Sequence, residues 1–209
     1  MHALFVHGMG RSPLSGARLL WSLRRQGISI SVFSYVVTFQ AFDAIVQRLA
    51  RQILRLAKQG DYVLIGHSLG GVLIRSAITR LPEGTRLPKR VFLLGSPVSP
   101  SRIATFLRKN WLYWLLTQDC GQLLASAERM EQIPACEVPT TSIVGTKGFH
   151  GRFSPFGNEP NDGAVTESEL FATWIDEEIR LPVTHTFMSS TCSVTEAILH
   201  RLFPQPDSP

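Results

Sequence analysis

The amino-acid sequence predicts an α/β fold, a three-layer α/β/α sandwich around a mainly parallel sheet of about six strands. Three observations support this prediction. Short β-rich runs alternate along the chain with longer stretches of helical periodicity. Several runs are apolar at nearly every position, as strands are when helices cover both faces of a parallel sheet. The alternation of strands and helices also requires crossover connections, which are right-handed in nearly all proteins.

The strands are expected at six places. Five of the runs are clear, and the run nearest the C-terminus has the weakest pattern. The runs cover residues 3–6, 28–35, 62–65, 91–94, 141–144 and 179–183.

Helices are expected between these runs. Apolar residues recur at helical spacing over 42–57, and again after Ser68 as far as Leu81. The acidic run "DEE" that begins at Asp176 is expected to be helical and exposed to solvent.

Residues 98–137 interrupt the alternation of strands and helices. This segment contains "NWLYWLLT", in which residues 111–116 are consecutive aromatic or aliphatic side chains that no helix can place on one face. Two interpretations remain open: a helix buried on two sides, or a cap over the carboxyl ends of the strands, in which Trp111 and Trp114 contact the substrate. No linker composition separates the segment, so we expect one domain over 1–209 with 98–137 as an insertion.

Composition and charge restrict the classes of function. Apolar residues make up 44% of the chain and charged residues 18%, which is typical of a globular protein. The net charge is +5, but the basic residues are scattered and form no aromatic-interleaved stripe, so no nucleic-acid partner is expected.

The cysteines and the N-terminal segment favour a cytoplasmic protein. Cys120, Cys136 and Cys192 are odd in number and far apart, which argues against a disulfide framework and a zinc site. The segment "MHALFVHGMG" lacks the features of a signal peptide, and no stretch reaches the length of a membrane span. Contact with a membrane is therefore expected to be peripheral at most.

The stretch "DYVLIGHSLGGVLIRSA", residues 61–77, places Ser68 in a G-x-S-x-G frame. The frame alone is a weak signal, but here an apolar run precedes it and a helical pattern follows it, as a nucleophilic serine on a strand–turn–helix requires. Gly66 and Gly70 have no side chains, so they avoid collisions with neighbouring chain at such a strained turn. Ser68 is the candidate nucleophile, and the alternative is an idle serine in a glycine-rich turn.

The chain resembles the α/β-hydrolase family, and within it the small lipases and esterases. "GHSLGG" is similar to the nucleophile elbow of that branch and to that of inositol deacylases, and "FVHGMG" is similar to its oxyanion motif. The resemblance covers most of the chain and is weakest across 98–137. Because the first expected strand leads directly into "HGMG", the resemblance implies a minimal version of the α/β-hydrolase fold.

The resemblance also implies a base and an acid that follow the serine in the chain. His185 lies after the last expected strand and is the implied base, with His150 in "KGFHGRF" as the alternative. Asp162 in "NDGAV" is the implied acid, although an aspartate in an ordinary Asp-Gly turn competes with that role. His7 and His67 are expected to hold the turns of the two motifs.

By the same resemblance, the backbone N–H groups of Met9 and Leu69 form the oxyanion hole. No metal is expected, because no metal-ligand spacing such as H-x-x-x-H occurs. No nucleotide cofactor is expected either, because Gly8, Gly10 and Gly16 do not match the dinucleotide fingerprint.

Together these residues predict a serine hydrolase that cleaves carboxylic esters of small-molecule or lipid substrates with an apolar acyl chain. Ser68 attacks the carbonyl carbon, His185 accepts the proton and returns it to the leaving alcohol, and Asp162 orients the imidazole. Two alternatives remain open: acyl transfer or thioester cleavage by the same residues, and a non-catalytic module that binds a ligand on this fold.

Overall fold

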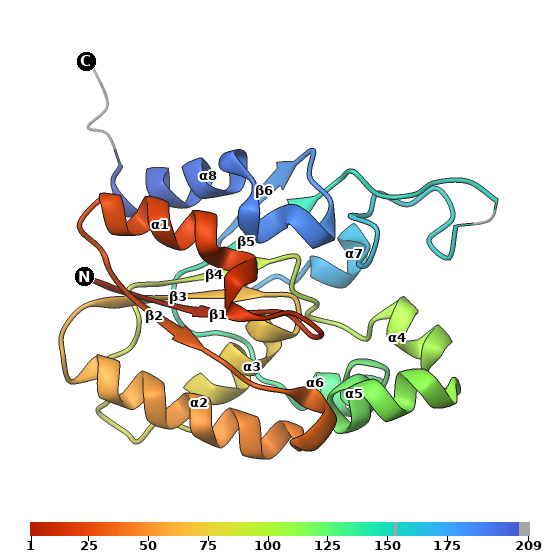
Figure 1. Cartoon of the computed structure of the whole chain (residues 1–209), viewed down its shortest axis with the longest axis horizontal. Helices are drawn as coiled ribbons and strands as arrows, with labels where there is room; N and C mark the ends of the chain where they lie inside the picture. Colours follow the sequence, from red (N-terminus) through yellow and green to blue (C-terminus); the bar gives the residue numbers. More distant parts are fainter. Residues whose placement is uncertain (153, 205–209) are drawn as a thin grey trace.

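A computed structural model describes residues 1–152 and 154–204, so the last five residues of the domain expected over 1–209 lie outside it. Six strands form one sheet in the order β2-β1-β3-β4-β5-β6, and every neighbouring pair is parallel (Figure 1). This arrangement confirms the predicted fold class. The strands are β1 (His2–Val6), β2 (Ser29–Phe33), β3 (Tyr62–His67), β4 (Arg90–Leu94), β5 (Thr140–Gly145) and β6 (Glu177–Leu181).

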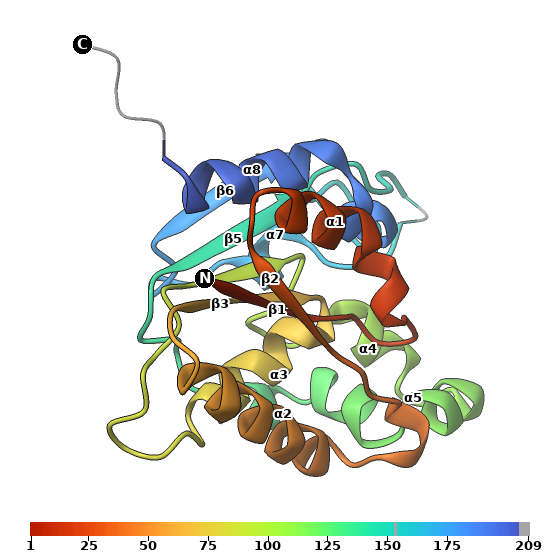
Figure 2. The ribbon, with the colours of Figure 1, turned by 60° about the vertical axis from the view of Figure 1, so that its left-hand side comes forward.

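Helices cover both faces of the sheet. Figures 1 and 2 show α1 (Ala17–Arg25) and α8 (Cys192–Leu202) on one face, and α2 (Phe42–Ala57) and α3 (Leu69–Ile78) on the other. Three short 3₁₀ helices lie in connections that follow strands. They are η1 (Pro13–Gly16), η2 (Val37–Phe39) and η3 (His185–Ser190).

The main core consists of two apolar layers, one on each face of the sheet, and a small third cluster contains Val144, Val165 and Leu170. Leu4 and Val6 of β1 pack into the layer beneath α2 and α3, whereas Ala3 and Phe5 pack into the layer beneath α1 and α8. Because alternate side chains of a strand point to opposite faces, burial on both faces explains the nearly continuous apolar runs.

The expected elements differ from the observed ones mainly at their ends. The helix after Ser68 ends at Ile78 and not at Leu81. The helical prediction for the acidic run was wrong, since Asp176 precedes β6 and the two glutamates belong to it. β6 is an edge strand, where carboxylates reach solvent or a cation, as Glu177 reaches the Arg201 guanidinium at 2.6 Å.

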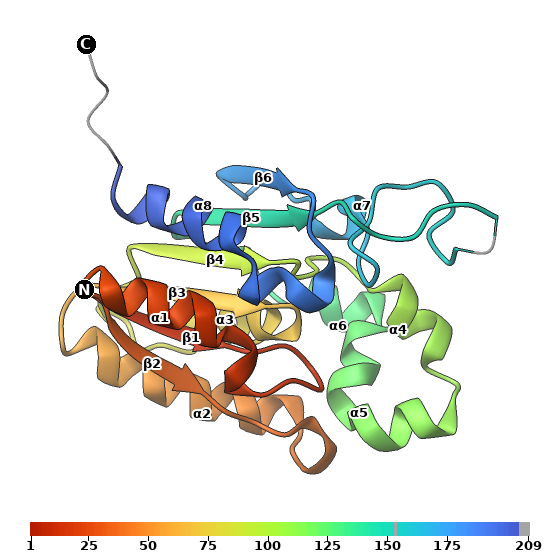
Figure 3. The same ribbon diagram turned by 45° about the horizontal axis from the view of Figure 1, so that its top comes forward.

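The long segment between β4 and β5 stands beyond the carboxyl ends of the strands (Figures 1 and 3). It contains α4 (Arg102–Leu107), α5 (Trp111–Leu124) and α6 (Ala127–Glu131), and α7 (Glu167–Leu170) follows β5 near the same edge. α5 is kinked at Gln118, whose φ is +47°. Within 1–152 and 154–204, no helix has the length and the hydropathy needed to cross a membrane.

Candidate active site

Ser68 occupies a sharp turn between β3 and α3. Its φ of 53° and ψ of −125° are unfavourable for a residue with a side chain, so the surroundings must hold the turn in place. Its N–H donates to the Leu94 carbonyl oxygen of β4 at 2.9 Å, and its own carbonyl oxygen accepts from the Ser96 hydroxyl at 2.7 Å. Leu69 begins α3, and its backbone N–H therefore lies at a helix N-terminus.

The glycines of the motif are required by close backbone contacts. A Cβ atom on Gly66 would lie 2.5 Å from the Gly71 Cα atom, and one on Gly70 would collide with the Val6 carbonyl oxygen of β1. Alanine at either position would push α3 away from the sheet. The expectation that these glycines remove colliding side chains therefore agrees with the geometry.

Asp162 and His185 are joined by a hydrogen bond. Asp162 is buried, and its Oδ2 atom lies 2.6 Å from the Nδ1 atom of the partly buried His185. The other carboxylate oxygen accepts from the N–H groups of Ala164 and Val165 at 2.9 and 2.8 Å. Asp162 thus holds its own turn with one oxygen and His185 with the other, so the two roles considered for it are compatible. With Nδ1 donating to the carboxylate, the imidazole Nε2 atom carries the free lone pair.

This pair lies beside the end of β4, next to the turn of Ser68. A Cβ atom on Gly95, whose φ is +53°, would lie 2.9 Å from Asp162 Oδ2 and 3.0 Å from His185 Nδ1. Gly95 directly follows Leu94, the residue that accepts the hydrogen bond of the Ser68 N–H. The Asp162–His185 pair and the turn of Ser68 therefore lie at the same edge of the sheet, beside the end of β4.

His67 connects the nucleophile turn with the segment of His185. Its buried ring donates from Nε2 to the His185 carbonyl oxygen at 3.0 Å, and the two ring centroids are 4.9 Å apart. Desolvation lowers the pKa of His67 to about 3, and His185, Arg11 and His7 add to the effect through their charges. The ring is therefore neutral near pH 7. Its Nδ1 atom has no hydrogen-bond partner in the described part of the chain.

The "HGMG" turn after β1 lies directly against Ser68. A Cβ atom on Gly8 would lie 3.1 Å from the Ser68 Cβ atom. The ring of Tyr35 stacks on His7 at 4.4 Å, and its hydroxyl donates to the His7 carbonyl oxygen at 2.7 Å. Burial keeps the pKa of Tyr35 well above its ordinary value, so the hydroxyl stays a donor. Met9 follows this supported turn.

A cavity of about 400 Å³ opens beside the same turn. Its walls are mostly apolar, and Arg11 is the charged residue among them. α5 contributes Leu116 and Thr117. The full lining is His7, Met9, Gly10, Arg11, Tyr35, Val36, Val37, Thr38, Leu116 and Thr117.

Trp111 and Trp114 do not line this cavity. Their exposed fractions are 73% and 52%, so the interpretation of a helix buried on two sides is wrong for this part of α5. The alternative base, His150, is an exposed loop residue, whereas Asp162 contacts His185.

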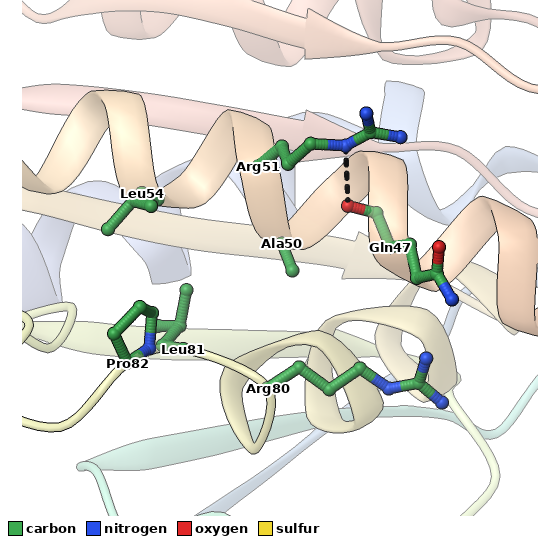
Figure 4. Close-up of a pocket in the computed structure, with 7 residues that line it drawn as sticks. All are labelled: Gln47, Ala50, Arg51, Leu54, Arg80, Leu81 and Pro82. Carbon is green, nitrogen blue, oxygen red and sulfur yellow. Dashed lines mark hydrogen bonds between the residues drawn. The ribbon is translucent and has the colours of Figure 1, made fainter.

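Figure 4 shows a second hollow, of similar volume, between α2 and the segment that follows α3. Ser68 precedes α3, whereas Arg80 and Pro82 of this hollow follow the other end of that helix, opposite Ala50 and Arg51 of α2. The Arg51 side chain donates to the Gln47 carbonyl oxygen at 3.3 Å, one turn earlier in the same helix (Figure 4). The hollow contains none of the residues considered for chemistry.

Sequence reasoning missed two residues that support the site, Tyr35 and Ser96. Neither belongs to a motif. The available signal was their position just after β2 and β4, because the carboxyl ends of parallel strands meet at one edge.

Comparisons with known proteins bear on the motif of Ser68 and on the fold. A family model described as "Putative serine esterase (DUF676)" matches residues 28–100, which include the Ser68 motif. A comparison with curated protein sequences gives no match.

Several solved structures share the fold. The mature lipase BlEst2 of Bacillus licheniformis is 21% identical, with a TM-score of 0.70 over 96% of this chain and 90% of its own. The thioesterase RedJ of Streptomyces coelicolor is 16% identical, with a TM-score of 0.65 over 96% and 88%. An extracellular α/β-hydrolase of a Paenibacillus species is 17% identical, with a TM-score of 0.63 over 98% and 100%. The chain thus has the α/β-hydrolase fold, as its resemblance to that family implied.

Proposed function

We propose that the chain is a serine hydrolase that cleaves carboxylic esters with an apolar acyl chain, using Ser68, Asp162 and His185. The observation that carries the proposal is the 2.6 Å hydrogen bond between Asp162 and His185, at the edge where the strained turn presents Ser68. A structural role alone would not require a buried carboxylate on a histidine beside such a turn. The match of residues 28–100 to a serine esterase model supports the same chemistry.

The reaction proceeds through an acyl-enzyme. His185 takes the Ser68 proton on Nε2 while Asp162 holds the Nδ1–H bond and stabilises the imidazolium. The Ser68 oxygen bonds to the carbonyl carbon, and the oxyanion accepts from the N–H groups of Met9 and Leu69. His185 then protonates the leaving alcohol. A water molecule releases the acyl group by the same route in reverse.

The cavity beside "HGMG" is the proposed acyl site. Its walls of Val36, Val37 and Leu116 suit a hydrocarbon chain, and its volume of about 400 Å³ suits a small-molecule or lipid ester. Residues 98–137 act as a cap, because α5 supplies one wall of this cavity from outside the sheet. No cofactor enters the mechanism.

Thioester cleavage or acyl transfer by the same residues is the second candidate, because the thioesterase RedJ shares the fold. We place the protein in the cytoplasm, because Cys120, Cys136 and Cys192 are all free thiols, as in a reducing compartment.

A fluorophosphonate probe and a p-nitrophenyl ester test the proposal directly. We expect the wild type to be labelled and active, and Ser68→Ala to lose the label and at least roughly three orders of magnitude in kcat/KM. Ser34→Ala is the matched control, because Ser34 is an exposed serine just after β2. An unlabelled, inactive wild type would favour the ligand-binding module. Labelling that persists in Ser68→Ala would assign the nucleophile to another residue.

A further inference from the structure

Large apolar side chains are exposed around the carboxyl edge of the sheet. Phe39, Phe106 and Phe149 are exposed by 88%, 79% and 73%. They follow β2, β4 and β5 in the chain, and parallel strands place their following segments at one edge (Figures 1 and 3). We call the set the apolar rim; it consists of Leu14, Phe39, Phe106, Trp111, Phe149 and Phe187.

The apolar rim differs from scattered surface hydrophobics. Its members come from the segments after β1, β2, β4, β5 and β6, yet they gather at one end of the molecule. By contrast, Trp21 lies on α1, along the flank of the sheet, and the Arg25 guanidinium covers its ring at 4.9 Å. A group of exposed aromatic side chains at one edge indicates an interaction surface.

The segments that carry the apolar rim contain no aspartate or glutamate. They are residues 9–18, 34–41, 102–118, 146–158 and 184–191. The edge therefore has an unusual charge pattern for a chain with 16 acidic residues.

Cations lie in these same segments. Arg108, Lys109, Lys147 and Arg152 are exposed, and none of them forms an ion pair within the described ranges.

Three carboxylates near this edge are engaged, whereas Glu128 and Glu131 of α6 are exposed and form no ion pair within the described ranges. Glu159 pairs with Arg102 at 2.7 Å, and Asp119 pairs with Arg129 at 2.8 Å. Asp162 is buried against His185. The segments that carry the apolar rim therefore have a net positive charge of their own.

We propose that the apolar rim and its surrounding cations dock on the surface of an anionic lipid bilayer. Aromatic side chains enter the boundary between headgroups and acyl chains, while lysine and arginine attract the anionic headgroups. A second copy of this chain fits the same surface poorly, because self-pairing would bring these cations together. The inference concerns where the protein works and is independent of the proposed reaction, since the rim residues do not line the cavity beside "HGMG".

Vesicle co-sedimentation of the full chain tests the proposal, with Ser68→Ala as the background so that lipid cleavage plays no part. We expect roughly tenfold stronger binding to vesicles of phosphatidylcholine and phosphatidylglycerol than to pure phosphatidylcholine, and weaker binding as salt increases. The triple variant Phe106→Ser, Trp111→Ser, Phe149→Ser should lose binding to both. Arg108→Gln with Lys109→Gln should lose only the preference for phosphatidylglycerol.

Trp21→Ser is the matched control and should bind like the background protein. Melting temperatures of all variants establish that each is folded. Failure of the background protein to bind either vesicle at low salt, or unchanged binding of the triple variant, would overturn the proposal. So would a concentration-dependent dimer that the triple variant abolishes, because the rim would then join two copies.

Discussion

The turn at Ser68 and the first half of α5 lie at the same edge of the sheet, but they are held in place in opposite ways. The turn is fixed by hydrogen bonds from Ser68 to β4 and from Ser96 to Ser68, with β1 pressed against Gly70. Five of the six side chains at 111–116 of α5 are exposed, by 43% to 73%, and one anchor of this stretch is the hydrogen bond from the Thr38 hydroxyl to the Leu116 carbonyl oxygen.

The rigid turn and the exposed helix suit two different requirements of a serine hydrolase site. Attack on a carbonyl requires the nucleophile and the base to keep one geometry, so unfavourable backbone angles are tolerated where the core surrounds them. Recognition of an apolar chain or a lipid surface requires apolar area outside the core, which a lightly anchored helix supplies. Substitutions in the turn should therefore reduce activity strongly on every substrate. Substitutions in α5 should reduce it mildly, and by an amount that depends on the substrate.

The largest effect is expected from the partners of Ser68. His185→Ala should reduce kcat/KM for a short p-nitrophenyl ester nearly as much as loss of Ser68, by roughly three or more orders of magnitude. Asp162→Asn should cost somewhat less. The asparagine Oδ1 atom can still accept from Ala164 and Val165, but its amide would face His185 Nδ1 as a donor and favour the wrong tautomer.

His150→Ala is the matched control for this prediction, because His150 is an exposed histidine in the same half of the chain. Full activity of His185→Ala together with an inactive His150→Ala would show that the base had been assigned to the wrong histidine.

The fold could be predicted almost completely from the sequence. Strands buried on both faces, such as β3 over Tyr62–His67, leave continuous apolar runs that are easy to recognise. Edge strands lack this signal, which is why the acidic run at Asp176 was assigned to a helix. In residues 98–137, side chains that remain exposed do not follow the periodicity of a core helix, so the sequence could not decide between burial and a cap.

The candidate site could be predicted only where a motif is local. Ser68 lies in its motif, whereas Asp162 and His185 are distant in the chain and were identified through a family resemblance. Their catalytic roles stay predictions, although the structure places them in contact. The stacking of Tyr35 on His7 depends on the pairing of β1 with β2 and has no local signature.

A smaller effect, on stability, should follow from His67. In the unfolded chain its ring takes up a proton as the pH falls below its ordinary pKa of 6.5, but in the folded protein it stays neutral until about pH 3. The unfolded state therefore binds more protons in this window, and stability decreases as the pH falls. From about pH 7 to about pH 5, this group should cost about 2 kcal/mol of the free energy of unfolding.

Denaturant unfolding of wild type and His67→Gln at both pH values checks this expectation. Glutamine keeps an N–H donor for the His185 carbonyl oxygen but does not titrate, so the variant should lose less stability on acidification. An identical pH dependence in the two proteins would contradict a buried, neutral His67.

The smallest effect is expected within α5, where one helix contributes both to the cavity and to the exposed surface. Leu116 lines the cavity, whereas Trp111 does not. On soluble p-nitrophenyl esters, Leu116→Ala should lower kcat/KM roughly threefold to tenfold more for a medium acyl chain than for acetate, because the longer chain loses an apolar wall. Trp111→Ala should leave this ratio unchanged.

Both side chains are largely exposed, so neither variant should change the melting temperature by more than a few degrees. If Trp111→Ala altered the chain-length ratio and Leu116→Ala did not, the acyl chain would have to lie along the outer face of α5, and the cavity beside "HGMG" would lose its proposed role.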